Sequence, residues 1–577
     1  MFTTKRAVTP LIFLLLLSLV QSVTPVTSAQ QQPARERKVA STVLASQTPG
    51  PSPVPGALTS PTPTPTPQAS PTPKVPTTTQ TLAELRARIA EVLRRPQLSQ
   101  AMVGIKVASL DTGRVLFEEN ANKLLRPASN MKLYTVAAAL DRLSPDYRFV
   151  TSVYAPAKPD AKGVVRGDLT IYGRGDPSIA ARFNDGNYFK GIDALTARIV
   201  AAGVKRVEGD LVGDESYFTG PPYGAGWEWE DLQWWYGAEV SALTVNDNYL
   251  DTSVKPGSKV GAPALITIAS PNPLLRISNR VTTAPNGTRR DLTIYRALGS
   301  DVMEVSGSIA LDDKGYSGRL AFSRPALLFA YLLRASLAQQ GVTIKGKTRT
   351  LDSYSGGSLV PKAVSFTNLL GGVNPKIASP TVHPPIEIAR QESVPFSLIA
   401  AQTLKPSQNL YTELILRTLG ETGRVSPTPN QNRTSEGRGI EVVRTFLKEA
   451  GLDPSSLSLT DGSGLSRNDM ITAEATLQML TYMHGHRYAT TFRDALPIAG
   501  IDGTLRNRMK GTAAENNVRA KTGTLSAASS LSGFVTSASG ERLVFSIMVN
   551  NYPETTDAPS VCIDPIAILL ASFAGKS

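Results

Sequence analysis

Apolar residues recur at helical spacing in three stretches of the chain. The first is Met131 to Leu143, where Met131, Val136, Ala137, Leu140 and Leu143 fall on one stripe. The preceding Arg126-Pro127-Ala128 provides a stop before this helix. Phe396 to Leu404 and Leu410 to Leu419 show the same spacing, and we predict that Gly420 closes the last of these helices.

Shorter apolar runs bounded by turn residues predict strands. Val103 to Phe117 is predicted to form a hairpin that turns at Asp111-Thr112-Gly113, and three further strands follow near the C-terminus: Val518–Gly523, Leu531–Val535 and Leu543–Val549. We expect these five strands to form one antiparallel sheet with helices on both faces, which is an α+β fold.

The N-terminal part of the chain is not expected to belong to the folded body. Residues 1–29 have a basic start, an apolar core from Leu11 to Val20 and small residues at Thr27 and Ala29, as in a secretory signal peptide. Residues 30–81 are rich in Pro, Thr and Ser and are predicted to be an extended, disordered linker. An exported protein is therefore expected, periplasmic or otherwise outside the cytoplasm; a retained signal that anchors the chain in the inner membrane is the alternative.

The remaining residues exceed one ordinary domain. We expect a discontinuous catalytic domain with a first piece at 82–154 and a second at 386–577. Residues 155–385 between them consist of short strands and turns and are predicted to be an inserted, mostly β region with two nested modules. The Gly- and Pro-rich stretch 353–385 looks expanded, and its sequence indicates no particular structure or function.

Three short motifs carry candidate chemistry: Ser129-Asn130-Met131-Lys132, Ser407-Gln408-Asn409 and Lys521-Thr522-Gly523. Ser129 and Lys132 are one helical turn apart, so the amine can take the hydroxyl proton. The second motif adds a hydroxyl and an amide, and the third adds a cation on a predicted strand. Together they supply an acyl-transfer site that uses no histidine.

Each motif has an ordinary structural alternative. Ser129 is also well placed to cap the helix that follows it. Ser-x-Asn recurs at Ser270 and Ser466, and we choose Ser407 because it lies between two predicted helices, where its side chains can point into a cleft. Lys-Thr-Gly occurs once, although a lysine on an antiparallel strand is usually only solvated.

The three motifs in this order resemble those of the peptidase S13 family, the D-alanyl-D-alanine carboxypeptidase/endopeptidases known as class C low-molecular-mass penicillin-binding proteins. The resemblance runs from about Leu82 to the C-terminus. Further blocks carry it: Gly173-Arg174-Gly175-Asp176-Pro177, Ser241 to Asn248, Asp461 to Arg467, Ala499 to Leu505 and Arg519 to Thr524. Gln408 departs from the Asp that the family often has. The resemblance implies the transpeptidase fold shared by penicillin-binding proteins and serine β-lactamases.

The resemblance also implies an activity. The enzyme would hydrolyse the D-Ala-D-Ala bond of peptidoglycan stem peptides, and D-alanyl cross-links, through an acyl group on Ser129. Lys132 would act as a neutral base, and we expect Lys521 to lower its pKa by like-charge repulsion. Ser407 would relay the proton to the departing amine, and Asn409 would hold the substrate amide. β-Lactams would acylate the same serine.

The backbone N–H groups of Ser129 and Thr524 are the oxyanion hole that the resemblance implies. Lys521 and the hydroxyls of Thr522 and Thr524 would receive the terminal carboxylate, with Gly523 on the same strand. Neither a metal nor an organic cofactor is expected. A serine β-lactamase and a non-catalytic cell-wall-binding protein are the rival interpretations; the long interval before Ser407 argues against the first, and the presence of every key side chain argues against the second.

Other residue types narrow the function further. The chain has only three histidines and one cysteine, which argues against a zinc-dependent carboxypeptidase with its three protein ligands. We interpret His484 and His486 as surface residues and Cys562 as a core residue. All four tryptophans fall within Trp227–Trp235, where packing inside the inserted region is favoured over sugar binding. The net charge of +13 favours peripheral association with an anionic envelope polymer, and nucleic acid is excluded for an exported chain.

Overall fold

The computed structural model describes residues 79–353, 385–423 and 434–577. The predicted signal and almost all of the predicted linker lie outside these residues, as does nearly all of the 353–385 stretch. The first described helix, α1 (Leu82–Leu93), begins directly after Thr81, whose Oγ1 accepts a hydrogen bond from Glu84 N.

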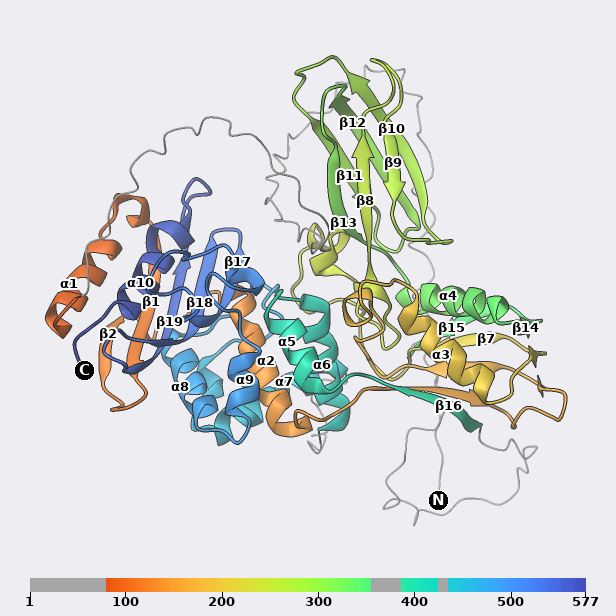
Figure 1. Ribbon diagram of the computed structural model, residues 1–577, viewed down its shortest axis with the longest axis horizontal. Coiled ribbons are helices and arrows are strands. Elements are labelled where there is room, and N and C mark those ends of the chain that lie inside the picture. Colours follow the sequence, from red (N-terminus) through yellow and green to blue (C-terminus); the bar gives the residue numbers. More distant parts are fainter. Residues whose placement is uncertain (1–78, 354–384, 424–433) are drawn as a thin grey trace, which may run out of the picture. The chain divides into compact units, whose positions relative to one another are not determined.

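The predicted five-stranded antiparallel sheet is present, with the strand order β17-β18-β19-β1-β2 (Figure 1). The N-terminal hairpin supplies two strands and the C-terminal part three: β1 (Met102–Ser109), β2 (Val115–Glu119), β17 (Arg519–Leu525), β18 (Ala528–Thr536) and β19 (Arg542–Asn550). Because β1 pairs with β19, the two ends of the described chain close one sheet.

Helices cover both faces of this sheet, as predicted. Together, α1 and α10 (Asp564–Ala571) pack on the face that presents Ile105 and Ile547. Cys562 is fully buried in this core, and burial raises the pKa of its thiol to about 12, so its interpretation as a core residue is confirmed. On the opposite face, α8 (Ala473–His484) lies against β1 and β19.

A helical lobe continues from that second face. Its centre is α2 (Met131–Leu143), buried from Met131 to Leu140 and enclosed by the helices α5 (Phe396–Leu404), α6 (Asn409–Thr422), α7 (Ser435–Glu449) and α9 (Ala489–Asp494). The predicted bounds of α2 and α5 are correct. The predicted end at Gly420 is wrong, because α6 continues through it and crosses α7 there: a Cβ at Gly420 would lie 2.8 Å from Gly439 N.

The inserted region contains a second five-stranded sheet of order β15-β7-β5-β3-β16 (Figure 1). Its strands are β3 (Val150–Ala155), β5 (Leu169–Tyr172), β7 (Leu211–Asp214), β15 (Thr348–Leu351) and β16 (Ile386–Glu392). Two helices, α3 (Lys190–Ala201) and α4 (Pro325–Gln339), pack with it, beside the small parallel sheet of β4 (Val164–Val165), β6 (Arg206–Val207) and β14 (Thr343–Ile344). Strands β3 and β16 pair with each other in this sheet, so boundaries at 154/155 and 385/386 cut through it.

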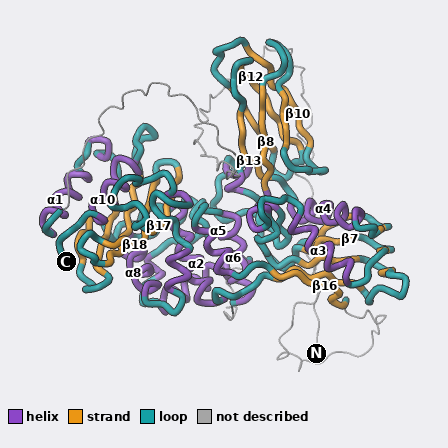
Figure 2. Tube along the Cα trace, viewed as in Figure 1, coloured by secondary structure: helices purple, strands orange, loops and turns teal. Residues whose placement is uncertain are grey.

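An all-β module interrupts the inserted region (Figure 2). It has two three-stranded sheets, β13-β8-β9 and β10-β12-β11. The strands are β8 (Tyr249–Lys255), β9 (Leu265–Ile268), β10 (Arg276–Ala284), β11 (Asp291–Arg296), β12 (Val302–Ala310) and β13 (Tyr316–Ala321). The expectation was of two nested, mostly β modules; the module around this one contains the helices α3 and α4 and is α/β.

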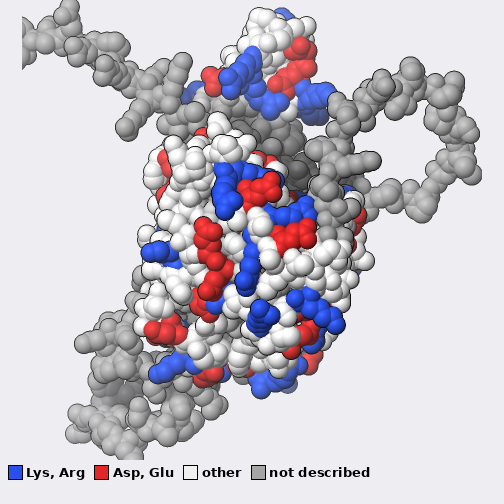
Figure 3. Space-filling model, turned by 90° about the vertical axis from the view of Figure 1, so that its left-hand side faces the viewer, with Lys and Arg blue, Asp and Glu red and all other residues white. Residues whose placement is uncertain are grey.

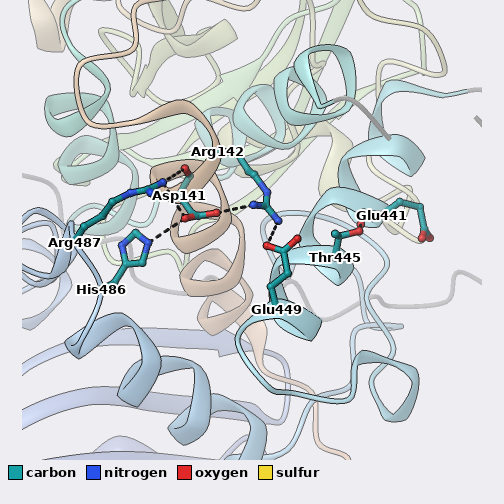
Figure 4. A network of polar contacts seen from close by, with 7 residues as sticks. All are labelled: Asp141, Arg142, Glu441, Thr445, Glu449, His486 and Arg487. Carbon is teal, nitrogen blue, oxygen red and sulfur yellow. Dashed lines mark hydrogen bonds and ion pairs between the residues drawn. The ribbon is translucent and has the colours of Figure 1, made fainter. Parts of the chain in front are cut away.

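The interpretation of His486 as a surface residue is wrong. The side chain of His486 is only 7% exposed; its Nδ1 accepts from Tyr488 N, and its Nε2 lies 3.0 Å from Asp141 Oδ1. Asp141 also binds Arg142 and Arg487 at the C-terminal end of α2 (Figure 4). Sequence periodicity could not find this network because its partners are more than 300 residues apart.

The surface charge is mixed on the face that Figure 3 draws, where Lys and Arg lie beside Asp and Glu. No helix within the described ranges is both long enough and apolar enough to cross a membrane.

The crossing of α6 and α7 generates a stability prediction. In Gly439→Ala the new methyl group would collide with the carbonyl oxygen of Leu416, a backbone atom that cannot rotate away. We expect the free energy of unfolding to fall by about 1–3 kcal/mol, measured by urea denaturation. Gly485→Ala is the matched control, because its nearest neighbour, Tyr482 O, would lie 3.8 Å away. Equal stability of the two variants would contradict this packing.

Candidate active site

Ser129 lies in a short 3₁₀ turn, η2 (Ala128–Asn130), immediately before α2. Ala128 has a left-handed backbone, with φ of 48°, which turns the chain sharply before the serine. Asn130 occupies the N-cap position of α2 and makes no side-chain capping bond. The alternative that Ser129 merely caps this helix is therefore wrong.

The turn that carries Ser129 is fixed to the sheet by polar contacts with β18. Ser530 Oγ donates to Pro127 O at 2.7 Å, and Asn130 Nδ2 donates to Ser532 Oγ at 2.7 Å. Gly523 on β17 also faces this turn: a Cβ there would lie 2.5 Å from Pro127 O and 3.0 Å from Ser129 N. Glycine thus allows the Lys-Thr-Gly strand to approach the backbone of the candidate nucleophile.

Lys132 is fully buried, and its amine has three partners. Nζ lies 2.8 Å from Ser129 Oγ, 2.6 Å from Asn409 Oδ1 and 2.8 Å from Ser463 O. Asn409 Oδ1 and Ser463 O can only accept hydrogen bonds. A neutral Lys132 amine donates its two N–H groups to these oxygens, which leaves its lone pair directed at the Ser129 hydroxyl.

The pKa of Lys132 is lowered to about 7, and burial is the main cause. Three carboxyl groups, Asp461, Glu413 and Asp469, oppose this by favouring the ammonium form. A substantial neutral fraction at neutral pH is what a general base requires.

The second motif lies between α5 and α6, as expected. Ser407 has a left-handed backbone, with φ of 64°, and Asn409 is the first residue of α6. Between them, Gln408 caps the helix, because its Oε1 accepts from Leu410 N at 3.2 Å. This is the capping position that the family's Asp would occupy, so Gln408 leaves the motif intact. The competing match at Ser270 lies in the all-β module between β9 and β10.

Lys521 on β17 is also fully buried, and it joins the second motif to the third. Its Nζ donates to Ser407 Oγ at 2.8 Å and to Thr522 O at 2.7 Å. Burial lowers the pKa of Lys521 well below its usual value, and repulsion from Lys132 adds to this. We expected Lys521 to help lower the pKa of Lys132 by like-charge repulsion; burial is the main cause at Lys132, and the resolved repulsion between the two lysines lowers the pKa of Lys521.

The hydroxyl-bearing residues beside Lys521 differ in exposure. Thr522 Oγ1 lies 2.7 Å from Thr504 Oγ1; Thr522 is buried, whereas Thr504 and Thr524 are exposed. Thr524 is thus available to an incoming molecule at the outer end of the motif.

Sequence reasoning missed several groups that surround Lys132. The loop Asp461–Ser466 supplies the Ser463 carbonyl, and Asp461 holds this loop by accepting from Gly464 N at 2.6 Å and Ser466 N at 2.9 Å. The sequence Asp461-Gly462-Ser463-Gly464 could have indicated a tight turn here. The structure has this turn, with Gly464 in the left-handed region at φ of 77°.

The tryptophan-rich segment also reaches the site. Trp227 Nε1 donates to Asp461 at 2.8 Å, and Asn409 Nδ2 donates to Tyr236 O at 2.8 Å. Trp234 packs inside the inserted region, as expected. Trp227 packs in a cluster that this region shares with α6, and Trp229 is 66% exposed.

Comparisons with known proteins identify the family of the chain. The model of the D-Ala-D-Ala carboxypeptidase 3 (S13) family matches residues 85–367 and 371–573. The chain is 34% identical over 505 residues to a D-alanyl-D-alanine carboxypeptidase of Actinomadura sp., covering 86% of each. It is 25% identical over 462 residues to the carboxypeptidase DacB of Haemophilus influenzae, covering 78% of this chain and 85% of that protein.

The fold is similar to the crystal structure of penicillin binding protein 4 from Haemophilus influenzae, with a TM-score of 0.69 at 21% identity over 85% of this chain and 99% of that one. The same protein complexed with a β-lactam gives a TM-score of 0.64 at 20% identity, covering 83% and 98%. The predicted penicillin-binding-protein fold is confirmed.

The pKa of Lys132 generates a prediction about pH. Lys132 can accept the Ser129 proton only when neutral, so the rate at which penicillin acylates Ser129 should rise with pH and level off above about 7. Stopped-flow measurement of acylation between pH 5 and 9 tests this. Lys132→Arg should acylate very slowly at every pH in this range, because the guanidinium stays protonated. A rate in wild type that does not change with pH, or near-normal acylation by Lys132→Arg, would contradict the assignment.

Proposed function

Because this chain belongs to the D-Ala-D-Ala carboxypeptidase 3 (S13) family, we propose that Ser129 is the nucleophile that cleaves the bond between two D-alanines of a peptidoglycan stem peptide. The observation that carries this assignment is the hydrogen-bond set of Lys132, whose two carbonyl partners leave the amine lone pair for Ser129. The site is that of a serine-type carboxypeptidase.

Acylation follows from these positions. Ser129 Oγ bonds to the carbonyl carbon of the penultimate D-alanine as its proton passes to Lys132. The backbone N–H groups of Ser129 and Thr524 stabilise the oxyanion. When the tetrahedral intermediate collapses, the C–N bond breaks and the departing amine takes up the proton that Lys132 accepted, relayed through Ser407, which contacts Lys521. Water then attacks the acyl group, and the serine is restored.

Lys521 receives the terminal carboxylate of the substrate, with the hydroxyls of Thr522 and Thr524. In the empty site, burial favours its neutral form. A bound carboxylate favours the ammonium form, since an opposite charge raises the pKa of an amine. Asn409 Nδ2 has a second N–H for the substrate amide, because only one is used by Tyr236 O.

The location of the substrate agrees with an exported enzyme. Peptidoglycan lies outside the cytoplasmic membrane, and the predicted signal at 1–29 would deliver the enzyme there, periplasmic or otherwise extracytoplasmic. The predicted linker at 30–81 would separate the enzyme from any surface to which its N-terminus is held. Peripheral association with the envelope is part of this proposal and follows from the net charge of +13.

A covalent adduct tests the nucleophile. Penicillin presents a strained amide in place of the D-Ala-D-Ala bond, so it should form one stable adduct on the peptide that contains Ser129, detected by intact-protein and peptide mass spectrometry. Ser129→Ala should form none. An adduct on Ser407, or rapid turnover of a chromogenic β-lactam, would overturn the assignment, the second outcome in favour of a β-lactamase.

The bond specificity is tested with cross-linked muropeptide dimers. A D-alanyl cross-link has the same acyl group and a D-centre with a carboxylate on the leaving side, so Ser129 and Lys521 can serve both bonds. Residues 82–577 should convert dimers to monomers, as resolved by liquid chromatography, and Ser129→Ala should not. Release of terminal D-alanine with intact dimers would limit the enzyme to carboxypeptidase activity.

A further inference from the structure

The segment Trp227–Tyr236 of the inserted region, here called the tryptophan segment, contacts two residues close to the amine of Lys132. One is Asn409, which accepts a hydrogen bond from Lys132, and the other is Asp461, which holds the loop of the second acceptor, the Ser463 carbonyl. The two contacts come from opposite ends of the segment. We propose that the tryptophan segment positions the general base, although it supplies no reacting atom. This inference rests on the proposed role of Lys132.

The first contact sets the orientation of an amide. Asn409 Nδ2 donates to Tyr236 O at 2.8 Å, and this carbonyl can only accept. The opposite end of the same amide, Oδ1, is therefore turned toward Lys132 Nζ, 2.6 Å away. With the amide reversed, an N–H group would face the amine and one of its acceptors would be lost.

The second contact acts through the loop that carries the Ser463 carbonyl. Trp227 Nε1 donates to Asp461 Oδ2 at 2.8 Å, and the same carboxylate accepts from Ser463 N at 3.0 Å. Asp461 is fully buried, so each donor that it accepts from offsets the loss of water around its charge. Trp227 thus stabilises the Asp461 carboxylate, which in turn holds the loop Asp461–Ser466 that presents the Ser463 carbonyl to Lys132.

The other side of the tryptophan segment is tied to the all-β module. Arg296 N donates to Gln233 Oε1 at 3.1 Å, and Arg296 Nη2 donates to Leu232 O at 3.3 Å. Trp234 forms a β-bridge with Leu320 and packs against the core of that module. Continuous contacts therefore run from the all-β module through the tryptophan segment to the amine of Lys132.

The segment also affects the charge balance at Lys132. The charged and titratable groups around this amine and its acidic neighbours are Asp461, Asp469, Glu413, Glu436, Arg417 and Lys521. Of these, Asp461 is the one that Trp227 touches. An indole N–H hydrogen bond reduces the negative potential of the carboxylate, so its removal should favour the ammonium form of Lys132.

The test uses Trp227→Phe, which keeps an aromatic ring and removes the N–H donor. The rate of penicillin acylation at pH 7 should fall about fivefold. Its pH midpoint should move upward by about half a unit. Trp229→Phe is the matched control: this exposed tryptophan lies in the same segment, and both rate and midpoint should equal those of the wild type.

A second variant tests the other contact. In Gly237→Ala the new methyl group would collide with the backbone of Asp231, which should displace the neighbouring Tyr236 carbonyl and slow acylation. Thermal melting of each variant separates loss of folding from loss of positioning. Unchanged rates in both variants, or slower acylation by Trp227→Phe with an unchanged midpoint, would overturn the inference. The proposed function fails separately, if wild-type enzyme is not acylated on Ser129.

Discussion

The site depends on burying two lysine amines in one site without leaving both of them charged. Lys132 and Lys521 have no exposed surface, and burial lowers the pKa of each. Each amine also contacts a different serine hydroxyl, that of Ser129 or that of Ser407. Burial disfavours the ammonium form of a lysine, and a neutral amine at neutral pH is what a general base requires.

The fold meets this requirement by bringing together distant parts of the chain. β1 and β19 join the two ends of the catalytic domain, and β18 fixes the turn that carries Ser129 through Ser530 and Ser532. At Gly523 and Gly464 a Cβ would collide with the backbone of Pro127 and Ala128, so these glycines allow a strand and a loop to lie against the turn that carries Ser129. The inserted region contributes two contacts to the surroundings of Lys132: the Trp227 indole N–H binds Asp461, and the Tyr236 carbonyl binds Asn409. Neither group takes part in the proposed reaction.

Sequence reasoning succeeded where the signal is local. The bounds of α2, the strands of the first sheet and the three motifs follow from periodicity, turn residues and spacing. It failed where tertiary contacts decide: Gly420 looks like a helix end until α7 packs on it, and His486 looks exposed until Asp141 reaches it. The carbonyls of Ser463 and Tyr236 could not be predicted, since any residue type provides a backbone oxygen. The tryptophan cluster that contains Trp227 was noticed in the sequence, but its contact with Asp461, 234 residues away, could not be predicted.

The protonation state of Lys132 in the unmodified enzyme is the central claim, and nuclear magnetic resonance measures it directly. The enzyme would be labelled with ¹³Cε-lysine, and the Lys132 signal assigned by its absence from Lys132→Arg. The account predicts that this signal titrates with a midpoint near pH 7. A midpoint close to that of an ordinary exposed lysine, about 10.4, would contradict it, because the amine would then be a cation that cannot take the Ser129 proton.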